Sequence, residues 1–174
     1  MSCHYAPVDV ASQLAALMQT QSSAWILTSA TLAVGDDFSH FKRRSGLSHA
    51  RSLRFESPFD FANQALLYLP KGLGEPGAPD HTGNVVTASL PVLDASGGRA
   101  FLLFTSLRAM REACELVRDE FKTRGLDYPV LLQGEGSRTE LLERFRKLGN
   151  AVLVASQSFW EGVDVAGDAL SVVV

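Results

Sequence analysis

The sequence predicts an α/β domain built on a parallel sheet that carries helices on both of its faces. Three short apolar runs, 100–104, 130–132 and 151–155, have the length of buried strands. They alternate with two segments, 107–121 and 137–148, whose apolar residues recur at spacings of three and four, as in amphipathic helices. Alternation of strands and helices favours parallel strands with helices covering both faces of the sheet.

The composition is that of a globular protein and gives no general attraction to nucleic acid. The 174 residues are 46% hydrophobic and 20% charged, with a net charge of −3. Any contact with nucleic acid must therefore come from a local patch. The two cysteines, Cys3 and Cys114, lack metal-ligand spacing and fit a reducing compartment. Because no apolar run reaches ~20 residues and no secretory signal follows Met1, we expect a cytoplasmic protein without membrane contact.

The first part of the chain predicts one helix and one strand. Apolar residues at helical spacing begin at Val10 and continue to Met18, with Asp9 as the expected N-cap. The apolar run 24–27 is expected to form a buried strand that opens into the hydroxyl-rich loop 28–32.

The middle of the chain is less regular. The segment 71–84 is rich in glycine and proline and predicts the clearest loop of the sequence. The segment 85–93 favours a helix, although Pro91 is unusual in a helix interior. Basic residues cluster in the segment 42–54. This basic segment and the loop 71–84 are candidate docking surfaces for a partner protein.

The two helices of the second half have clear end signals. Gly125 is expected to end the first of them. Ser137 is expected to cap the second, with Glu140 completing a capping box. The apolar residues of this second helix expected to face inward are Leu141, Leu142, Phe145 and Leu148.

Three polar segments follow predicted strands. They are Thr28–Thr31, the pair Thr105 and Ser106, and the loop 156–167. Open parallel sheets bind ligands at the carboxyl ends of their strands, where loops and helix N-termini gather. A structural interpretation stays open for the first two segments, as a hydroxyl-rich loop and as the N-cap of a helix.

The loop 156–167 carries the strongest chemical signal. Glu161 and Asp164 flank Gly162, whose backbone can approach a ligand closely. Carboxylates in this setting can accept ribose hydroxyls or organise water and a magnesium ion around phosphates. A structural alternative is that Trp160 packs inward, the glycines form turns and Asp164 caps the next element.

Other catalytic signatures are absent from the sequence. There is no Gly-x-x-x-x-Gly-Lys-Ser/Thr phosphate loop, and the acidic pair Asp36-Asp37 follows no predicted strand. The four histidines are scattered and form no nucleophile–base pattern. We therefore expect no autonomous catalytic site.

These motifs, in this order, resemble the superfamily 2 DNA helicases of the DinG/YoaA group, which are relatives of XPD. The segment 28–32 is similar to helicase motif III, and 57–61 to the family's lead-in to its second motor domain. The segment 103–106 is similar to motif IV, and 133–145 to the strand–helix element that follows it. The segment 159–164 is similar to motif V and is the most specific of the five.

The resemblance implies a motor of two RecA-like domains that closes over ATP and moves along single-stranded DNA. Residues 1–50 would be the end of the first motor domain, with motif III. Residues 51–174 would be the second, three-layer RecA-like domain, truncated before motif VI, because the chain stops within an apolar strand. The parent would use ATP and Mg²⁺ for 5′-to-3′ unwinding in DNA repair. Its expected partners are single-stranded DNA, the first motor domain and a repair or replication protein.

The resemblance also implies roles for individual residues. The residues implied for nucleotide binding are Glu161, Gly162 and Asp164. Those of motif III, which couples the nucleotide site to DNA, are Thr28, Ser29, Ala30 and Thr31. The residues implied for the DNA side are Thr105, Ser106, Gln133 and Ser156.

The chain departs from the family pattern in what it lacks. The phosphate loop, motif VI and the four cysteines of the iron–sulfur cluster found in many relatives are absent, which leaves a cluster elsewhere in the parent open. We therefore expect the chain alone neither to hydrolyse ATP nor to unwind DNA. Two alternatives stay open: a protein-interaction module that docks a repair or replication partner, and a stand-alone nucleotide-binding or transferase domain.

Overall fold

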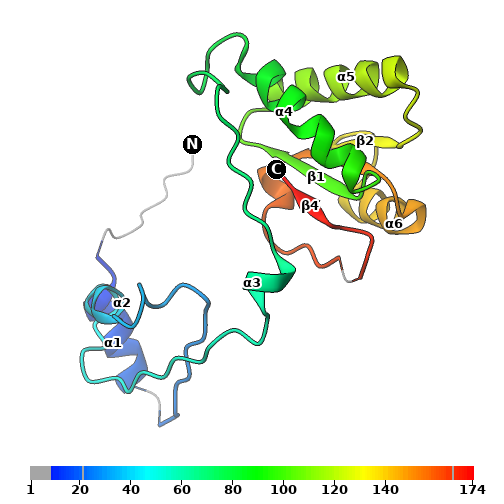
Figure 1. The fold of residues 1–174 in the computed structure, drawn as a ribbon. Coiled ribbons are helices and arrows are strands. Elements are labelled where there is room, and N and C mark those ends of the chain that lie inside the picture. Colours follow the sequence, from blue (N-terminus) through cyan, green and yellow to red (C-terminus); the bar gives the residue numbers. More distant parts are fainter. Residues whose placement is uncertain (1–8, 21, 166) are drawn as a thin grey trace, which may run out of the picture. The chain divides into compact units, whose positions relative to one another are not determined.

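The contacts within the chain divide it into two units, Met1–Leu66 and Leu67–Val174. The structure is a computed structural model (Figure 1). It describes residues 9–20, 22–165 and 167–174. The expected sheet, its helices and both apolar clusters lie in the second unit.

All strands of the second unit run parallel in one sheet of order β2-β3-β1-β4. β1 and β3 lie at its centre, and Phe104 at the end of β1 is in register with Ser156 at the end of β3. The strands are β1 (Ala100–Phe104), β2 (Val130–Leu132), β3 (Val152–Ser156) and β4 (Val172–Val173). The strands expected at 100–104 and 130–132 are confirmed with these bounds, and the third is shifted by one residue.

Helices cover both faces of this sheet (Figure 1). Successive residues of a strand point to opposite faces. Leu102 accordingly packs in one cluster with α4 and α5, whereas Phe101 packs in the other with α6. The helices are α4 (His81–Ala95), α5 (Leu107–Arg124) and α6 (Arg138–Leu148). The expected three-layer α/β fold with a parallel sheet is confirmed.

The predicted helix ends are largely confirmed. Gly125 ends α5 in the left-handed conformation, with φ +67°. Ser137 and Glu140 form the capping box of α6. Leu148 was expected to face inward, and this is wrong: its side chain is 43% exposed, because it is the last residue of α6 and lies beyond the part of the helix that covers the sheet.

The loop expected at 71–84 is shorter than predicted, because α4 already begins at His81. The first turn of α4 binds the loop: the His81 ring nitrogen Nδ1 lies 3.0 Å from the Leu73 carbonyl oxygen, and Asn84 Nδ2 donates to the same oxygen. The helix favoured for 85–93 is confirmed, with Pro91 inside it.

The first unit contains helices but no strand within residues 9–20 and 22–66. Asp9 was expected to be the N-cap of α1, but Val10 holds that position, and Asp9 accepts a hydrogen bond from the Ala11 amide instead. The strand expected at 24–27 is wrong, since Ile26 is 85% exposed and the run has no neighbouring strand with which to pair. The helices of this unit are α1 (Ala11–Gln19), α2 (Ser39–Ser45) and α3 (Phe61–Gln64).

Candidate functional site

The carboxyl ends of β1, β2 and β3 lie at one edge of the sheet, because the strands are parallel and adjacent. Three segments leave the sheet there: the pair Thr105 and Ser106, the turn 133–137 that leads to α6, and residues 157–165. These are the second-unit segments in which the sequence located ligand-binding residues. We call this edge the rim.

A side-chain contact joins two of these segments. Gln133, directly after β2, accepts two hydrogen bonds through Oε1 from Ser156 at the end of β3. The backbone amide of Ser156 donates at 2.7 Å and its hydroxyl at 2.9 Å. Ser156 is buried, whereas Gln133 is partly exposed. Because Oε1 is occupied, the amide group of Gln133 is left to offer N–H donors to a ligand.

The two hydroxyls after β1 are both exposed, but they differ in their local role. The Ser106 oxygen accepts a long hydrogen bond, 3.5 Å, from the Ala109 amide and caps α5. This is the N-cap interpretation that the sequence left open for Ser106. The structure gives Thr105 no such capping bond within the described residues.

The segment after β3 forms an exposed turn anchored by a buried ring. The 3-10 helix η1 (Gln157–Phe159) follows the strand directly, and Phe159 is only 3% exposed. The next residue, Trp160, is 55% exposed, so the inward packing considered for it is wrong. Phe159 fills that role instead. We refer to residues 160–164 as the rim turn.

The two carboxylates of the rim turn are exposed. Glu161 and Asp164 are both accessible to solvent, on either side of Gly162 with its φ of +66°. None of the ion pairs found among the described residues includes either carboxylate. Both groups are therefore available to a ligand that approaches the rim.

Two arginines of α6 hold the backbone of the rim turn. Arg138 donates through Nη2 to the carbonyl oxygens of Glu161 and Gly162, each at 2.8 Å. Arg146 donates to the carbonyl oxygen of Asp164. Neither arginine was predicted from the sequence as part of the site. Their spacing along α6, little more than two helical turns, was the available signal, but it does not identify the loop that they contact.

Two charged contacts fix the neighbouring turn between β2 and α6. The Glu140 carboxylate binds Ser137, and the backbone hydrogen bond lowers its pKa. Partial burial raises the pKa of Glu135, but the hydrogen bond from Arg118 at 2.8 Å and the bond from the Leu132 amide outweigh it, and the net shift is downward. Both carboxylates thus stabilise the turn in their charged form.

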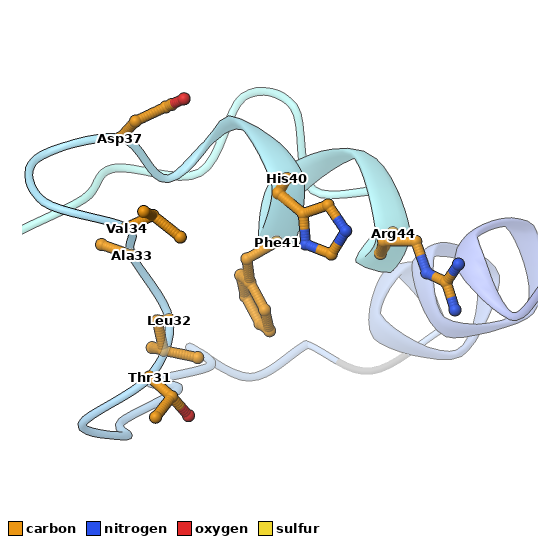
Figure 2. Close-up of a pocket in the computed structure, with 8 residues that line it drawn as sticks. All are labelled: Thr31, Leu32, Ala33, Val34, Asp37, His40, Phe41 and Arg44. Carbon is orange, nitrogen blue, oxygen red and sulfur yellow. The ribbon is translucent and has the colours of Figure 1, made fainter. Parts of the chain in front are cut away.

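Thr28–Thr31, the segment expected to form motif III, lie in the first unit, in an exposed turn. The Thr31 amide donates to the Ser29 hydroxyl at 3.2 Å, which closes the turn locally. Thr31 also lines a half-open hollow of about 370 Å³ (Figure 2). Side chains of α2 form its other wall, with Phe41 directed toward Leu32.

A metal-binding cluster and a helix able to cross a membrane are both absent from the part of the chain that the structure describes. No group of three or more histidine, cysteine, aspartate or glutamate side chains is placed to hold a metal ion there. None of the helices in those residues combines the length and the apolar character needed to cross a bilayer.

Comparison with known proteins gives matches along the chain. Residues 90–174 match a family model described as a helicase C-terminal domain. The ATP-dependent DNA helicase YoaA of Escherichia coli (strain K12) is 44% identical over 168 residues, which cover 97% of this chain and 26% of the helicase.

More distant relatives carry a second name. The ATP-dependent helicase DinG of Mycobacterium tuberculosis (strain H37Rv) is 37% identical over 97% of this chain and 25% of the helicase. A protein named 3′-5′ exonuclease DinG, of Bacillus subtilis (strain 168), is 28% identical over 96% of this chain and 18% of its own length. The chain thus spans about a quarter, or less, of the length of these relatives.

Proposed function

The chain belongs to the DinG/YoaA-type helicases, and we propose that it supplies one wall of an ATP cleft and part of a track for single-stranded DNA. In this proposal residues 51–174 act as the second RecA-like motor domain, and residues 1–50 are the end of the first. The main support for this proposal is the exposed rim turn after β3, since parallel sheets of this type bind ligands at that edge. Relatives named as helicases along nearly the whole chain favour this function over a dedicated protein-docking module.

The rim turn forms the nucleotide side of this site. Glu161 and Asp164 are exposed carboxylates without an ion-pair partner among the described residues, so binding a ligand costs no existing contact. They can accept hydrogen bonds from ribose hydroxyls or order the water shell of a phosphate-bound Mg²⁺ ion. The left-handed backbone at Gly162 lets the turn approach the nucleotide without a side chain in between.

The other rim residues form the DNA side. The amide group of Gln133 is held by Ser156 and offers N–H donors, and the Thr105 hydroxyl is exposed. Neutral donors of this kind contact phosphate and sugar oxygens, which positions a strand without reading its sequence. In the first unit, Thr28–Thr31 would couple the nucleotide to the DNA track, as the family resemblance implies.

The parent protein, on this proposal, uses ATP and Mg²⁺ to unwind DNA in the 5′-to-3′ direction during repair. This chain alone is inactive, because its sequence contains neither a phosphate loop nor motif VI. We expect the purified chain to show no ATP turnover above the blank, with or without single-stranded DNA. DNA-stimulated turnover that persists after a second, independent purification would refute the proposal.

Trp160 provides a direct test of the nucleotide side, because it lies next to Glu161 and is one of only two tryptophans. In a Trp25→Phe background, we expect Mg²⁺-ATP to change the Trp160 emission at millimolar concentration. The double variant Glu161→Gln/Asp164→Asn should lose this response. The exposed Glu143→Gln on α6 serves as the matched control and should keep it. Equal responses in all three proteins would contradict the assignment.

A further inference from the structure

The backbone of the rim turn is held by one arginine side chain of α6. Its carbonyl groups at Glu161 and Gly162 both point to one nitrogen atom, Nη2 of Arg138, at 2.8 Å each. Gly162, between these two carbonyl groups, adopts the left-handed conformation with φ +66°, which a glycine tolerates better than other residues. The turn is therefore shaped around the guanidinium group.

Arg138 also contacts the anchor of the turn. Its guanidinium carbon lies 5.8 Å from the centroid of the Phe159 ring, and Phe159 is buried against the sheet. One cation thus touches both the buried start of the segment and the exposed turn that follows. Because it binds backbone oxygens, the Glu161 and Asp164 carboxylates remain free of it.

The position of Arg138 in α6 is itself fixed. It is the first residue of the helix, directly after the N-cap Ser137, and the capping box with Glu140 holds this end. The same short segment begins at Gln133, which binds Ser156. Arg138 consequently joins the segment that follows β2 to the turn that follows β3.

We propose that Arg138 is a positioning residue that holds the rim turn, and that Arg146 adds a second hydrogen bond, to the carbonyl oxygen of Asp164. It touches backbone oxygens and leaves the carboxylates of Glu161 and Asp164 to the ligand. The consequence for nucleotide binding rests on the proposed function, whereas the positioning of the turn does not.

The test uses the full chain with Trp25→Phe, so that Trp160 alone reports on the turn. Arg138→Gln removes the cation and keeps a polar side chain, whereas Arg138→Lys keeps a charge that can reach one carbonyl. Arg144→Gln is the matched control, since Arg144 is an exposed arginine of the same helix that makes no hydrogen bond to the rim turn within the described residues. Circular dichroism establishes that each variant retains its helices.

We expect Arg138→Gln to raise the acrylamide quenching constant of Trp160, by less than about twofold because the side chain is already 55% exposed, and to lower its steady-state anisotropy. The reason is that two hydrogen bonds from a charged group are lost from the turn. Arg138→Lys should restore part of both values, and Arg144→Gln should leave them unchanged. Equal changes in Arg138→Gln and Arg144→Gln, or no change in either, would overturn the proposal. Should Arg138→Gln not fold, the comparison of Arg138→Lys with Arg144→Lys decides in the same way.

A second measurement separates this inference from the proposed function. If Arg138 positions the turn for nucleotide, Mg²⁺-ATP should require several-fold higher concentration to change Trp160 emission in Arg138→Gln than in the Arg144→Gln control. A mobile turn in Arg138→Gln, combined with no nucleotide response in any protein, would support positioning and refute the nucleotide site. A rigid turn in Arg138→Gln, with a normal response, would refute positioning and leave the nucleotide site intact.

Discussion

The two units of the chain differ in how they bury apolar side chains. In the described residues, every buried hydrophobic residue of the core lies between Val86 and Phe159, in the second unit. The first unit contains apolar residues too, but Ile26 and Phe55 are 85% and 86% exposed. Composition alone therefore does not produce a core. The second unit buries its apolar runs because its strands have neighbouring strands and helices to pack against.

The same difference separates the rim segments of the second unit from the turn Thr28–Thr31 of the first unit. The rim segments are held by contacts with β2, β3 and α6, such as those of Gln133 and Arg138. The turn Thr28–Thr31 is closed by its own residues, through the hydrogen bond from the Thr31 amide to the Ser29 hydroxyl. The rim segments should therefore keep their geometry without a ligand better than the turn Thr28–Thr31 does.

The largest expected effect is on the core of the second unit. Phe145 is fully buried and packs edge-on against Phe101, with ring centroids 4.8 Å apart. Phe145→Ala should lower the free energy of unfolding by about 3–5 kcal/mol, measured by urea denaturation followed at Trp160 in the Trp25→Phe background.

The matched change in the first unit is Ile26→Ala, which truncates an exposed side chain. It should alter the same unfolding curve by less than about 0.5 kcal/mol. If Ile26→Ala destabilised the protein as much as Phe145→Ala, the contrast between the units would be wrong.

A smaller effect is expected at the start of α6. Ser137→Ala removes the oxygen that accepts the Glu140 amide and should cost about 1 kcal/mol of unfolding free energy. Thr139→Ala, at an exposed position of the same helical turn, is the control and should have little effect. Equal losses in the two variants would indicate that the capping box does not stabilise the helix.

The smallest expected effect is a pH dependence. The hydrogen bond from the Ser137 amide lowers the pKa of Glu140 below 4.5, so the folded protein favours the charged carboxylate. Its stabilisation is present above pH 4.5 and is lost as the pH falls through the lower, folded pKa. Urea midpoints measured downward from neutral pH should therefore fall less steeply in Glu140→Gln than in the unsubstituted chain.

The first unit contains a similar carboxylate. Asp37 accepts hydrogen bonds from the amide and hydroxyl of Ser39, and the backbone bond lowers its pKa. Because α2 contributes no residue to the two apolar clusters found in the described part of the chain, Asp37→Asn should leave the acid dependence seen at Trp160 unchanged. A change as large as that of Glu140→Gln would contradict this separation.

The sequence predicted the second unit well, because its signals are local. The apolar run 100–104, the Ser137 capping box and Gly125 each specify an element through their own neighbours. The prediction at 24–27 was wrong because a strand also requires a partner strand, which a local apolar run does not reveal. The prediction for Leu148 was wrong because helical spacing does not show where the covered part of a helix ends.

The candidate site was predictable in its parts but not in its contacts. The rim turn was predicted from Glu161, Gly162 and Asp164, and it does follow β3 at the expected edge. The hydrogen bonds from Arg138 and Arg146 could not be predicted, because they join residues 18 to 24 positions apart. Their acceptors are backbone oxygens, which have no sequence signature. The pairing of the Gln133 side chain with Ser156 likewise joins residues 23 positions apart.

We propose that adenine nucleotide binds at the rim turn, and photolabelling with 8-azido-ATP and Mg²⁺ can locate such binding in the chain. We expect the label to map by mass spectrometry to the peptide that contains residues 157–165 and to disappear with excess ATP. Label that resists excess ATP, or that maps to the first unit or to the far edge of the sheet, would show that nucleotide does not bind at the rim turn.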